Sequence, residues 1–354
     1  MRDSSPSPPS QRTVRRRTVQ IPTNSHLANN GEGGRYLRLC MLGCEDHPPY
    51  GPTEATGALF LTLIASAIQS AHPPTCSTTH NSTTGTAETV NFEIVISIFR
   101  VQVMDYPEDK EWDQFDGVLI PGSFSSAYET AEWIEKLKHV IQEEIYAKQR
   151  KTMAVCFGHQ LYAHSFNHGG QGGLCKPCPR GHQAGRRSSS LTKEGLSLLH
   201  VIESDAQRSS DVNVSETNPK EIQLMYTHGD MVASLPPCAV PLFGNDAVPI
   251  QAAAYFSDAE EASKFRHYLH AGCGDNMAEL PRPHAFTFQA HPEYCSKDGL
   301  NITFTNILTA LGERKALPQS DLTEAKTDTT NAFPKLQEES IHLMVTVGKT
   351  LGWF

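Results

Sequence analysis

The segment AVCFGHQ, at positions 154–160, carries the residue best suited to nucleophilic chemistry. Cys156 follows a short apolar run and precedes a stretch with helical spacing, so we expect a strand, a sharp turn at the cysteine and a helix. Such a turn needs small neighbours, which Ala154 and Gly158 provide. The helix N-terminus would stabilise a thiolate through its unpaired N–H groups. The pattern predicts a nucleophile, although a lone cysteine after an apolar strand is commonly a small core residue.

Two further segments contain groups that would assist a thiolate. In QAHPEY, His291 and Glu293 are two residues apart after an apolar strand, and an extended backbone would place them on one face. A histidine oriented by a carboxylate can act as general base and acid beside a cysteine. The N–H of Phe157 and a backbone N–H of the Pro121-Gly122-Ser123 turn would bind an oxyanion, and glycine permits close approach there. A single His-Pro-Glu is commonplace, but the three segments together predict a catalytic site.

The segment CKPC at 175–178, with His182, has the residue types of a zinc site. A structural zinc normally takes four ligands, and the sequence contains no second CxxC motif. We therefore expect loop thiols here, and neither a metal nor a cofactor. The GEGGR segment at 31–35 precedes an apolar strand instead of following one, unlike a phosphate-binding loop.

The elements that must position these groups alternate along the chain. Short apolar strands are expected near 35–42, 92–103, 115–120, 151–156, 221–228, 248–256 and 284–291, and helical spacing follows several of them. This order predicts an α/β fold with a mainly parallel central sheet. Active sites of such sheets lie in the loops at the carboxyl ends of the strands, where Cys156 and His291 are placed.

One domain at 35–311 accounts for this pattern. It is expected to carry surface insertions at about 72–91, 175–215 and 257–283. Residues 1–34 are rich in Ser, Pro and Arg and predict a disordered tail, with a cleaved mitochondrial presequence as the alternative. Residues 312–354 are expected to form a polar linker and a terminal helix.

Composition limits the kinds of binding partner and the cellular compartment that we expect for this protein. The net charge of −9 argues against a general nucleic-acid binder, which needs a basic face. The nine cysteines are an odd number without regular spacing, which indicates reduced thiols in the cytosol. The apolar run at 58–68 is too short to span a bilayer, so no membrane association is expected.

Taken together, AVCFGHQ, VLIPGS, FQAHPEY and YTHGDMVASLP resemble the signature segments of class I glutamine amidotransferases. The resemblance spans roughly residues 36–310 and implies a flavodoxin-like sheet flanked by helices. It implies a triad of Cys156, His291 and Glu293. It also implies an oxyanion hole at Gly122 and Phe157. The substrate contacts that it implies are Gln160, Thr227 and His228. The chain departs from the family at Ala154, where glycine is usual, and in the segment GGQGGLCKPCPRG.

The reaction implied by the resemblance is hydrolysis of a γ-glutamyl amide, either glutamine or a γ-glutamyl peptide, through a glutamyl thioester. One form is a self-contained hydrolase similar to plant γ-glutamyl peptidases. The other is a glutaminase subunit, similar to the amidotransferase domain of GMP synthase, which would donate ammonia to a separate synthase. A non-catalytic amidotransferase-like scaffold is the third alternative.

Overall fold

The structure, a computed structural model, describes residues 13–22, 36–73, 89–169, 172–200, 221–271 and 280–354. The strands in this part of the chain are β1 (Thr13–Pro22), β2 (Tyr36–Gly43), β3 (Thr89–Arg100), β4 (Gly117–Ile120), β5 (Thr152–Val155), β6 (Leu174–Pro177), β7 (Gln183–Leu191), β8 (Glu221–His228), β9 (Asp230–Ser234), β10 (Ala239–Gly244), β11 (Ala252–Tyr255) and β12 (Ala285–Phe288). The α-helices are α1 (Thr53–Ala71), α2 (Glu132–Val140), α3 (Phe157–His164), α4 (Lys193–His200), α6 (Ala259–Ala271), α7 (Thr305–Glu313) and α8 (Gln319–Leu351).

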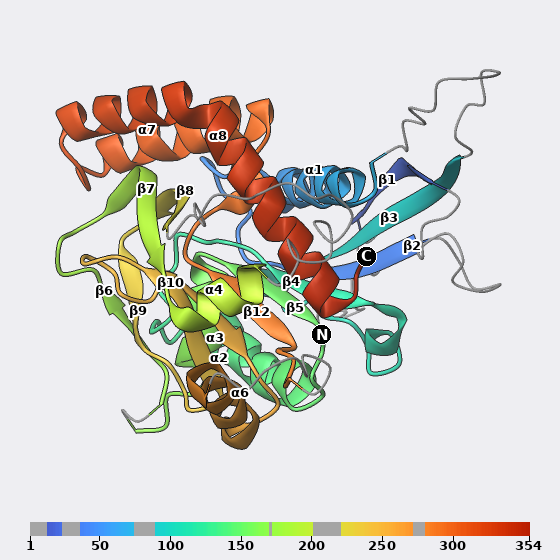
Figure 1. Cartoon of the computed structure of the whole chain (residues 1–354). Coiled ribbons are helices and arrows are strands. Elements are labelled where there is room, and N and C mark those ends of the chain that lie inside the picture. Colours follow the sequence, from blue (N-terminus) through green and yellow to red (C-terminus); the bar gives the residue numbers. More distant parts are fainter. Residues whose placement is uncertain (1–12, 23–35, 74–88, 170–171, 201–220, 272–279) are drawn as a thin grey trace, which may run out of the picture.

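A large twisted sheet runs through the molecule, with strand order β1-β3-β2-β4-β5-β12-β11-β10-β7-β8 (Figure 1). The five central strands, in the order β3-β2-β4-β5-β12, are parallel to one another. Antiparallel strands extend this centre on both sides. The predicted α/β fold with a parallel central sheet is therefore confirmed. The carboxyl ends of β4, β5 and β12 meet at one edge, where the candidate site lies.

Helices cover both faces of the sheet, and alternation along the strands assigns each side chain to a layer. In β2, Leu39 and Met41 belong to the core beneath α1 and α8, whereas Cys40 and Leu42 belong to the core beneath α2 and α3. Figure 1 shows α1 and α8 together on the first of these faces. The fold thus buries both faces of the parallel strands, as their continuous apolar sequences require.

Helix α1 contains the longest apolar run of the chain. At 19 residues it is long and apolar enough to cross a membrane, by length and composition alone. It instead packs against β1, β3 and α8, and its buried side chains, such as Phe60 and Ile64, belong to the main core. In this fold it is a core helix.

The predicted disordered tail at 1–34 is wrong for part of its length. Residues 13–22 form β1, which pairs antiparallel with β3 along its whole length. Val19 and Ile21 on this strand are buried in the main core. Burial of these two side chains and pairing with a strand far along the chain outweigh the Arg-rich local composition. The remaining tail residues lie outside the described part.

The three predicted insertions have different outcomes. Residues 74–88, most of the first, lie outside the described part. The second, 175–215, is wrong as a simple surface insertion, because β7 pairs with β8 and β10 within the large sheet. Residues 201–215 of this range lie outside the described part. In the third, α6 covers the start of 257–283 as the predicted helix, and residues 272–279 lie outside the described part.

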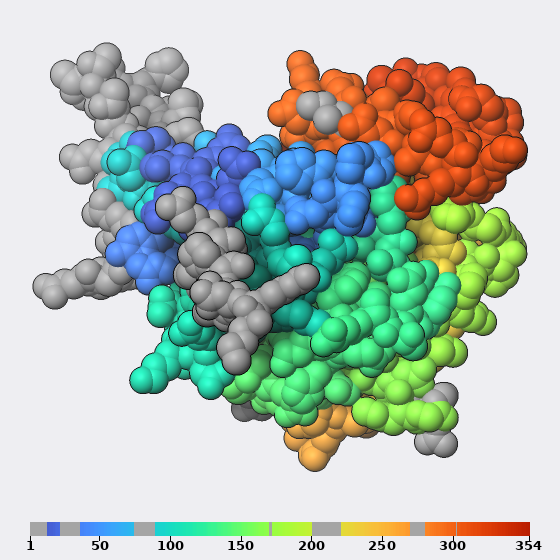
Figure 2. All heavy atoms as spheres, turned by 180° about the vertical axis from the view of Figure 1, so that it is seen from behind, coloured from blue at the N-terminus to red at the C-terminus, as the bar shows by residue number. Residues whose placement is uncertain are grey.

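The polar linker expected after residue 311 is also wrong. Helix α7 continues to Glu313, and α8 runs for 33 residues from Gln319. Widely spaced apolar residues, among them Leu322 and Leu336, recur on one buried face of α8. Seen from behind in Figure 2, the two C-terminal helices (orange to red) gather at one end of the molecule, beside the yellow-green strands.

Candidate active site

Cys156 lies at the junction between β5 and α3 in a strained backbone conformation. Its φ of 50° and ψ of −108° place it in a region that side-chain-bearing residues rarely adopt. Its N–H donates to the carbonyl of Phe288 at 2.8 Å, which ties the turn to β12. A side chain at Gly158 would collide with the carbonyl oxygen of Ile120, so this position requires glycine. The predicted strand, sharp turn and helix are present, and nucleophile elbows have this geometry.

His291 and Glu293 form a buried pair beyond the end of β12. His291 Nδ1 and Glu293 Oε1 are 2.7 Å apart. The two residues meet across a short 3-10 turn, Pro292–Tyr294, and not along an extended strand as the sequence predicted. The backbone N–H of His291 donates to the carbonyl of Met225 on β8 at 2.8 Å, which anchors the turn to the antiparallel part of the sheet.

The electrostatic setting of His291 favours its protonated form. Burial alone would lower its pKa, but the negative charges of Glu293 and Cys156 outweigh burial and raise it. His291 Nε2 has no hydrogen-bond partner among the described residues. Tyr294 stacks almost parallel on the imidazole, with ring centroids 4.4 Å apart and planes 7° apart. The stacked ring and the carboxylate together fix the imidazole orientation.

Gly122 lies between the candidate nucleophile and this histidine. A methyl group built on Gly122 would be 3.4 Å from Cys156 Cβ and 3.1 Å from His291 Cε1. The turn after β4 therefore lies against Cys156 and His291, as the sequence predicted. Phe157 is the first residue of α3, where backbone N–H groups have no partner within the helix. The N–H groups of Gly122 and Phe157 are thus suitable donors for an oxyanion at Cys156.

Glu45 holds the Gly122 turn in place, a role that the sequence analysis missed. This buried carboxylate accepts hydrogen bonds through Oε2 from Ser123 Oγ at 3.2 Å and from the N–H of Phe124 at 3.1 Å. Tyr50, from the same loop after β2, packs edge-on against Phe124 with centroids 4.8 Å apart. The available signal was an acidic pair directly after an apolar strand, at the same edge of the sheet as Cys156.

A cavity of about 340 Å³ opens beside Cys156. Its lining includes three of the predicted contact residues, Gln160, Thr227 and His228. Thr227 Oγ1 and His228 Nε2 are buried and have no hydrogen-bond partner within the described part of the chain. Burial lowers the pKa of His228 to about 3, so its ring is neutral at physiological pH. The cavity thus presents unpaired neutral polar groups next to the sulfur.

Asp230 is a charged residue in the lining of this cavity, and the sequence did not predict its role. Its carboxylate accepts hydrogen bonds from Ser126 Oγ at 2.6 Å and from the Tyr128 hydroxyl at 3.0 Å. Its backbone carbonyl accepts from Gln160 Nε2 at 2.9 Å and lies 2.8 Å from His228 Nδ1. Part of the hydrogen-bonding capacity of Gln160 is therefore used to shape the cavity.

The segment CKPC does not form the loop that the sequence predicted. Its first three residues lie in β6, which pairs with β9. Cys178 follows the strand directly, and both Cys178 and His182 line the cavity. Cys178 Sγ is 3.7 Å from His228 Nδ1. Among the described residues, no group of three or more His, Cys, Asp and Glu side chains could hold a metal ion. The segment instead supplies a wall of the cavity.

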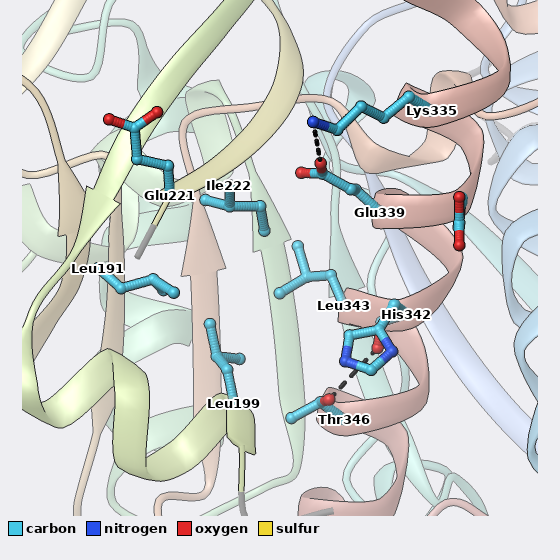
Figure 3. A pocket seen from close by; sticks show the side chains of 10 residues that line it. Leu191, Leu199, Glu221, Ile222, Lys335, Glu339, His342, Leu343 and Thr346 are labelled. Atoms are coloured by element: carbon cyan, nitrogen blue, oxygen red, sulfur yellow. Dashed lines mark hydrogen bonds and ion pairs between the residues drawn. The ribbon is translucent and has the colours of Figure 1, made fainter. Parts of the chain in front are cut away.

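A second cavity, of about 360 Å³, lies between α8, α4 and the edge strand β8. Figure 3 shows Lys335, Glu339 and Leu343 of α8 facing Glu221 and Ile222 across it. The lining has no cysteine, and none of the residues beside Cys156 contributes to it. Chemistry at Cys156 therefore uses the smaller cavity.

Comparison with known proteins assigns the chain to a class. A sequence model described as "Glutamine amidotransferase class-I" matches residues 86–310, which contain Cys156, His291 and Glu293. The chain belongs to this family. Solved structures show the same fold. A glutamine amidotransferase from Thermotoga maritima has a TM-score of 0.52 at 13% identity, over 89% of this chain and 98% of that one. A second, from Methylobacillus flagellatus, has a TM-score of 0.50 at 14% identity, over 90% and 95%.

Curated relatives include γ-glutamyl peptidases of Arabidopsis thaliana. Gamma-glutamyl peptidase 3 is 28% identical over 197 residues, which is 56% of this chain and 62% of the relative. Gamma-glutamyl peptidase 5 is 28% identical over 158 residues, which is 45% of this chain and 56% of the relative. The chain thus spans less than two thirds of the length of either peptidase.

Proposed function

We propose that this protein hydrolyses γ-glutamyl amide bonds through a covalent thioester on Cys156. The observation that carries the proposal is the placement of Gly122 against both Cys156 and His291, with Glu293 bonded to the far side of the imidazole. A nucleophile, an oriented acid–base group and oxyanion donors therefore surround one point at the cavity floor. Membership of the amidotransferase family supports the same chemistry.

In the first step, the Cys156 sulfur attacks the γ-carbonyl carbon of the substrate as the thiolate, with its proton already held by His291. The carbonyl oxygen gains negative charge and accepts hydrogen bonds from the N–H groups of Gly122 and Phe157. His291 carries a proton because of the charge beside it, and Nε2 delivers this proton to the departing nitrogen. The C–N bond breaks, and ammonia or an amine leaves as the thioester forms.

In the second step, neutral His291 takes a proton from water, and the water oxygen attacks the thioester carbon. The C–S bond breaks, the sulfur leaves as the thiolate, and glutamate is released. Glu293 and the stacked Tyr294 hold the imidazole through both steps, since each step needs Nε2 in the same direction. Every proton transfer is thus assigned to a group of this chain.

The cavity supports a γ-glutamyl group as the acyl part of the substrate. Such a group carries an α-ammonium, and Asp230 provides a fixed carboxylate on the cavity wall. Ser126 and Tyr128 donate to Asp230 and keep its oxygens in place, leaving lone pairs for a cation. The unpaired Thr227 hydroxyl and His228 ring supply further hydrogen bonds.

Two kinds of γ-glutamyl hydrolase remain candidates, and we favour the self-contained peptidase. The likeness to Gamma-glutamyl peptidase 3 supports this choice over an ammonia-donating subunit. The oxyanion turn is also already held by Glu45 in the isolated chain, so no partner is needed to orient it. We further propose a reducing compartment such as the cytosol, because none of the described cysteines forms a disulfide with another described residue.

The test uses the purified full chain with glutamine and with γ-glutamyl dipeptides, and follows the release of glutamate. Turnover of dipeptides by the chain alone, lost in Cys156→Ala, supports the peptidase. Turnover that appears only with a synthase subunit present would contradict it. A fully active Cys156→Ala variant would rule out the thioester mechanism.

A further inference from the structure

Arg314 is an exposed charged residue that contacts Phe124, one of the residues lining the Cys156 cavity. It follows α7 directly, and its guanidinium carbon is 4.3 Å from the centre of the Phe124 ring. Phe124 lines the cavity, as does Leu311, one helical turn before Arg314. Residues three apart on a helix share a face, so Arg314 extends the cavity wall that Leu311 begins. The matched family region ends at residue 310, before Arg314.

The position of this guanidinium is fixed through the oxyanion turn. Phe124 is held by its N–H bond to buried Glu45 and by the edge-on contact with Tyr50. A stacked guanidinium uses its flat face against the ring and leaves its N–H edge free to donate. Among the described residues, no carboxylate lies within ion-pair distance of Arg314. Its donors are therefore available to a ligand.

One charge of each sign lies in or against the cavity lining. Burial is the largest cause of the lowered pKa of His182, which lines the cavity. The charge of Asp230 acts in the opposite sense, and Arg314 lies close enough to lower this pKa further. Asp230 suits the α-ammonium of the γ-glutamyl group. A positive group at the outer end suits an anion on the part of the substrate that leaves.

We propose that Arg314 is a specificity residue that binds the carboxylate of the leaving amino acid or dipeptide. The inference rests on the proposed hydrolysis and goes beyond it by defining the leaving group. The preferred substrate is then a γ-glutamyl peptide with a free C-terminal carboxylate. Glutamine, whose leaving group is ammonia, makes no use of Arg314.

The experiment compares γ-glutamylalanine, its C-terminal amide and glutamine as substrates of the full chain. In the wild type we expect kcat/KM to be about tenfold higher for the acid than for the amide, the size of one exposed charge-assisted contact. Arg314→Gln should lose this preference through a higher KM for the acid, with the amide and glutamine unchanged. Arg314→Lys should restore part of it. Lys315→Gln, an equal change of charge at the next exposed residue, should retain it.

A measurement of ligand affinity tests this inference independently of the proposed hydrolysis. Calorimetric titration of Cys156→Ala with the acid and the amide needs no turnover, and we expect the acid to bind about tenfold tighter only while Arg314 is present. Equal affinity for the two ligands, or no binding of either, would overturn the inference even if hydrolysis is confirmed. If Arg314→Gln impairs glutamine as strongly as the dipeptide, Arg314 serves the glutamyl group instead, and the inference is wrong. Absence of hydrolysis with a retained binding preference would contradict only the proposed function.

Discussion

His291 Nδ1 and Glu293 Oε1 lie 2.7 Å apart, and neither side chain is more than 2% exposed. A neutral imidazole would be the stable form in such a buried place without a nearby charge. The carboxylate and the Cys156 sulfur reverse this preference and raise the pKa of His291. The pair therefore keeps a proton available where the leaving amine needs one.

Glu293→Gln should lower kcat/KM at least about a hundredfold, as for other buried acids that orient a catalytic histidine. The negative charge raises the pKa of His291, so its removal lowers that pKa. The alkaline limb of the pH profile, where His291 loses its proton, should therefore move to lower pH. Glu135→Gln, at an exposed position on α2, serves as the control. An alkaline limb that stays in place would contradict the assigned role of Glu293.

Gly122→Ala should lower kcat by about tenfold to a hundredfold with the fold intact. The added methyl group would lie 3.1 Å from His291 Cε1 and 3.4 Å from Cys156 Cβ, in the space of the reacting carbonyl. The N–H of residue 122 remains in this variant, so we expect a smaller loss than the roughly 10²–10³-fold cost of removing an oxyanion donor outright. Ser125→Ala alters the same cavity wall and should remain close to the wild type. Steady-state kinetics with matched melting curves decide the comparison, and equal activity of the two variants would count against the oxyanion assignment.

Glu45→Gln should reduce kcat about tenfold while substrate affinity changes little. The amide keeps the size of the carboxylate but has one acceptor oxygen instead of two. In Glu45, Oε2 accepts from Ser123 Oγ and the Phe124 N–H, while Oε1 accepts from the N–H groups of Asp46 and His47. The NH₂ group of glutamine must therefore face one of these two pairs of donors. The oxyanion turn then loses its fixed position. The measurement is kcat against KM for the dipeptide. A rise in KM at constant kcat would mean that Glu45 acts on substrate binding instead.

The two cysteines of the cavity should differ in reactivity. Burial, together with the charges of Asp230 and Cys156, raises the pKa of Cys178 to about 12. Cys178 is then a neutral thiol at physiological pH and reacts slowly with alkylating reagents. Brief treatment with iodoacetamide at pH 7 should modify Cys156 before Cys178, as peptide mapping would show. Raising the pH towards 10 should increase modification of Cys178. Preferential labelling of Cys178 at pH 7 would refute the predicted order.

Strand β1 should contribute to stability. Ile21 is fully buried in the main core, whereas Val14 on the same strand is 41% exposed. Ile21→Ala should lower the free energy of unfolding by about 2–4 kcal/mol, from lost burial and the cavity left behind. Val14→Ala should change it by less than about 0.5 kcal/mol. Urea unfolding curves measure both, and equal small effects would show that β1 is not part of the stable fold.

Local sequence patterns were sufficient to predict the residues at the centre of the site. The elbow at Cys156 could be predicted because a strand, a turn and a helix in direct succession leave few positions for its side chain. His291 and Glu293 could be paired because they are two residues apart. Their meeting across a 3-10 turn was not predicted, since Pro292 is compatible with both an extended segment and a helical first turn.

Contacts between distant segments were the part that sequence patterns missed. Strand β1 depends on β3, whose paired residues lie 67 to 85 positions further along the chain, and its Arg-rich composition hid the alternation of Val19 and Ile21. Glu45 lies 78 residues from Ser123, its hydrogen-bond partner. Cys178 and His182 reach the cavity only because β6 pairs with β9. None of these pairings has a signal within a short window of sequence.

The most direct measurement of the central claim is mass spectrometry of the full chain, quenched in acid during turnover of a γ-glutamyl dipeptide. Acid preserves a thioester, so the intact mass should rise by one γ-glutamyl group. Peptide mapping should locate that group on the fragment containing Cys156, and the adduct should be absent from Cys156→Ala. Turnover without any adduct in rapidly quenched samples, or an adduct on another of the nine cysteines, would contradict the mechanism.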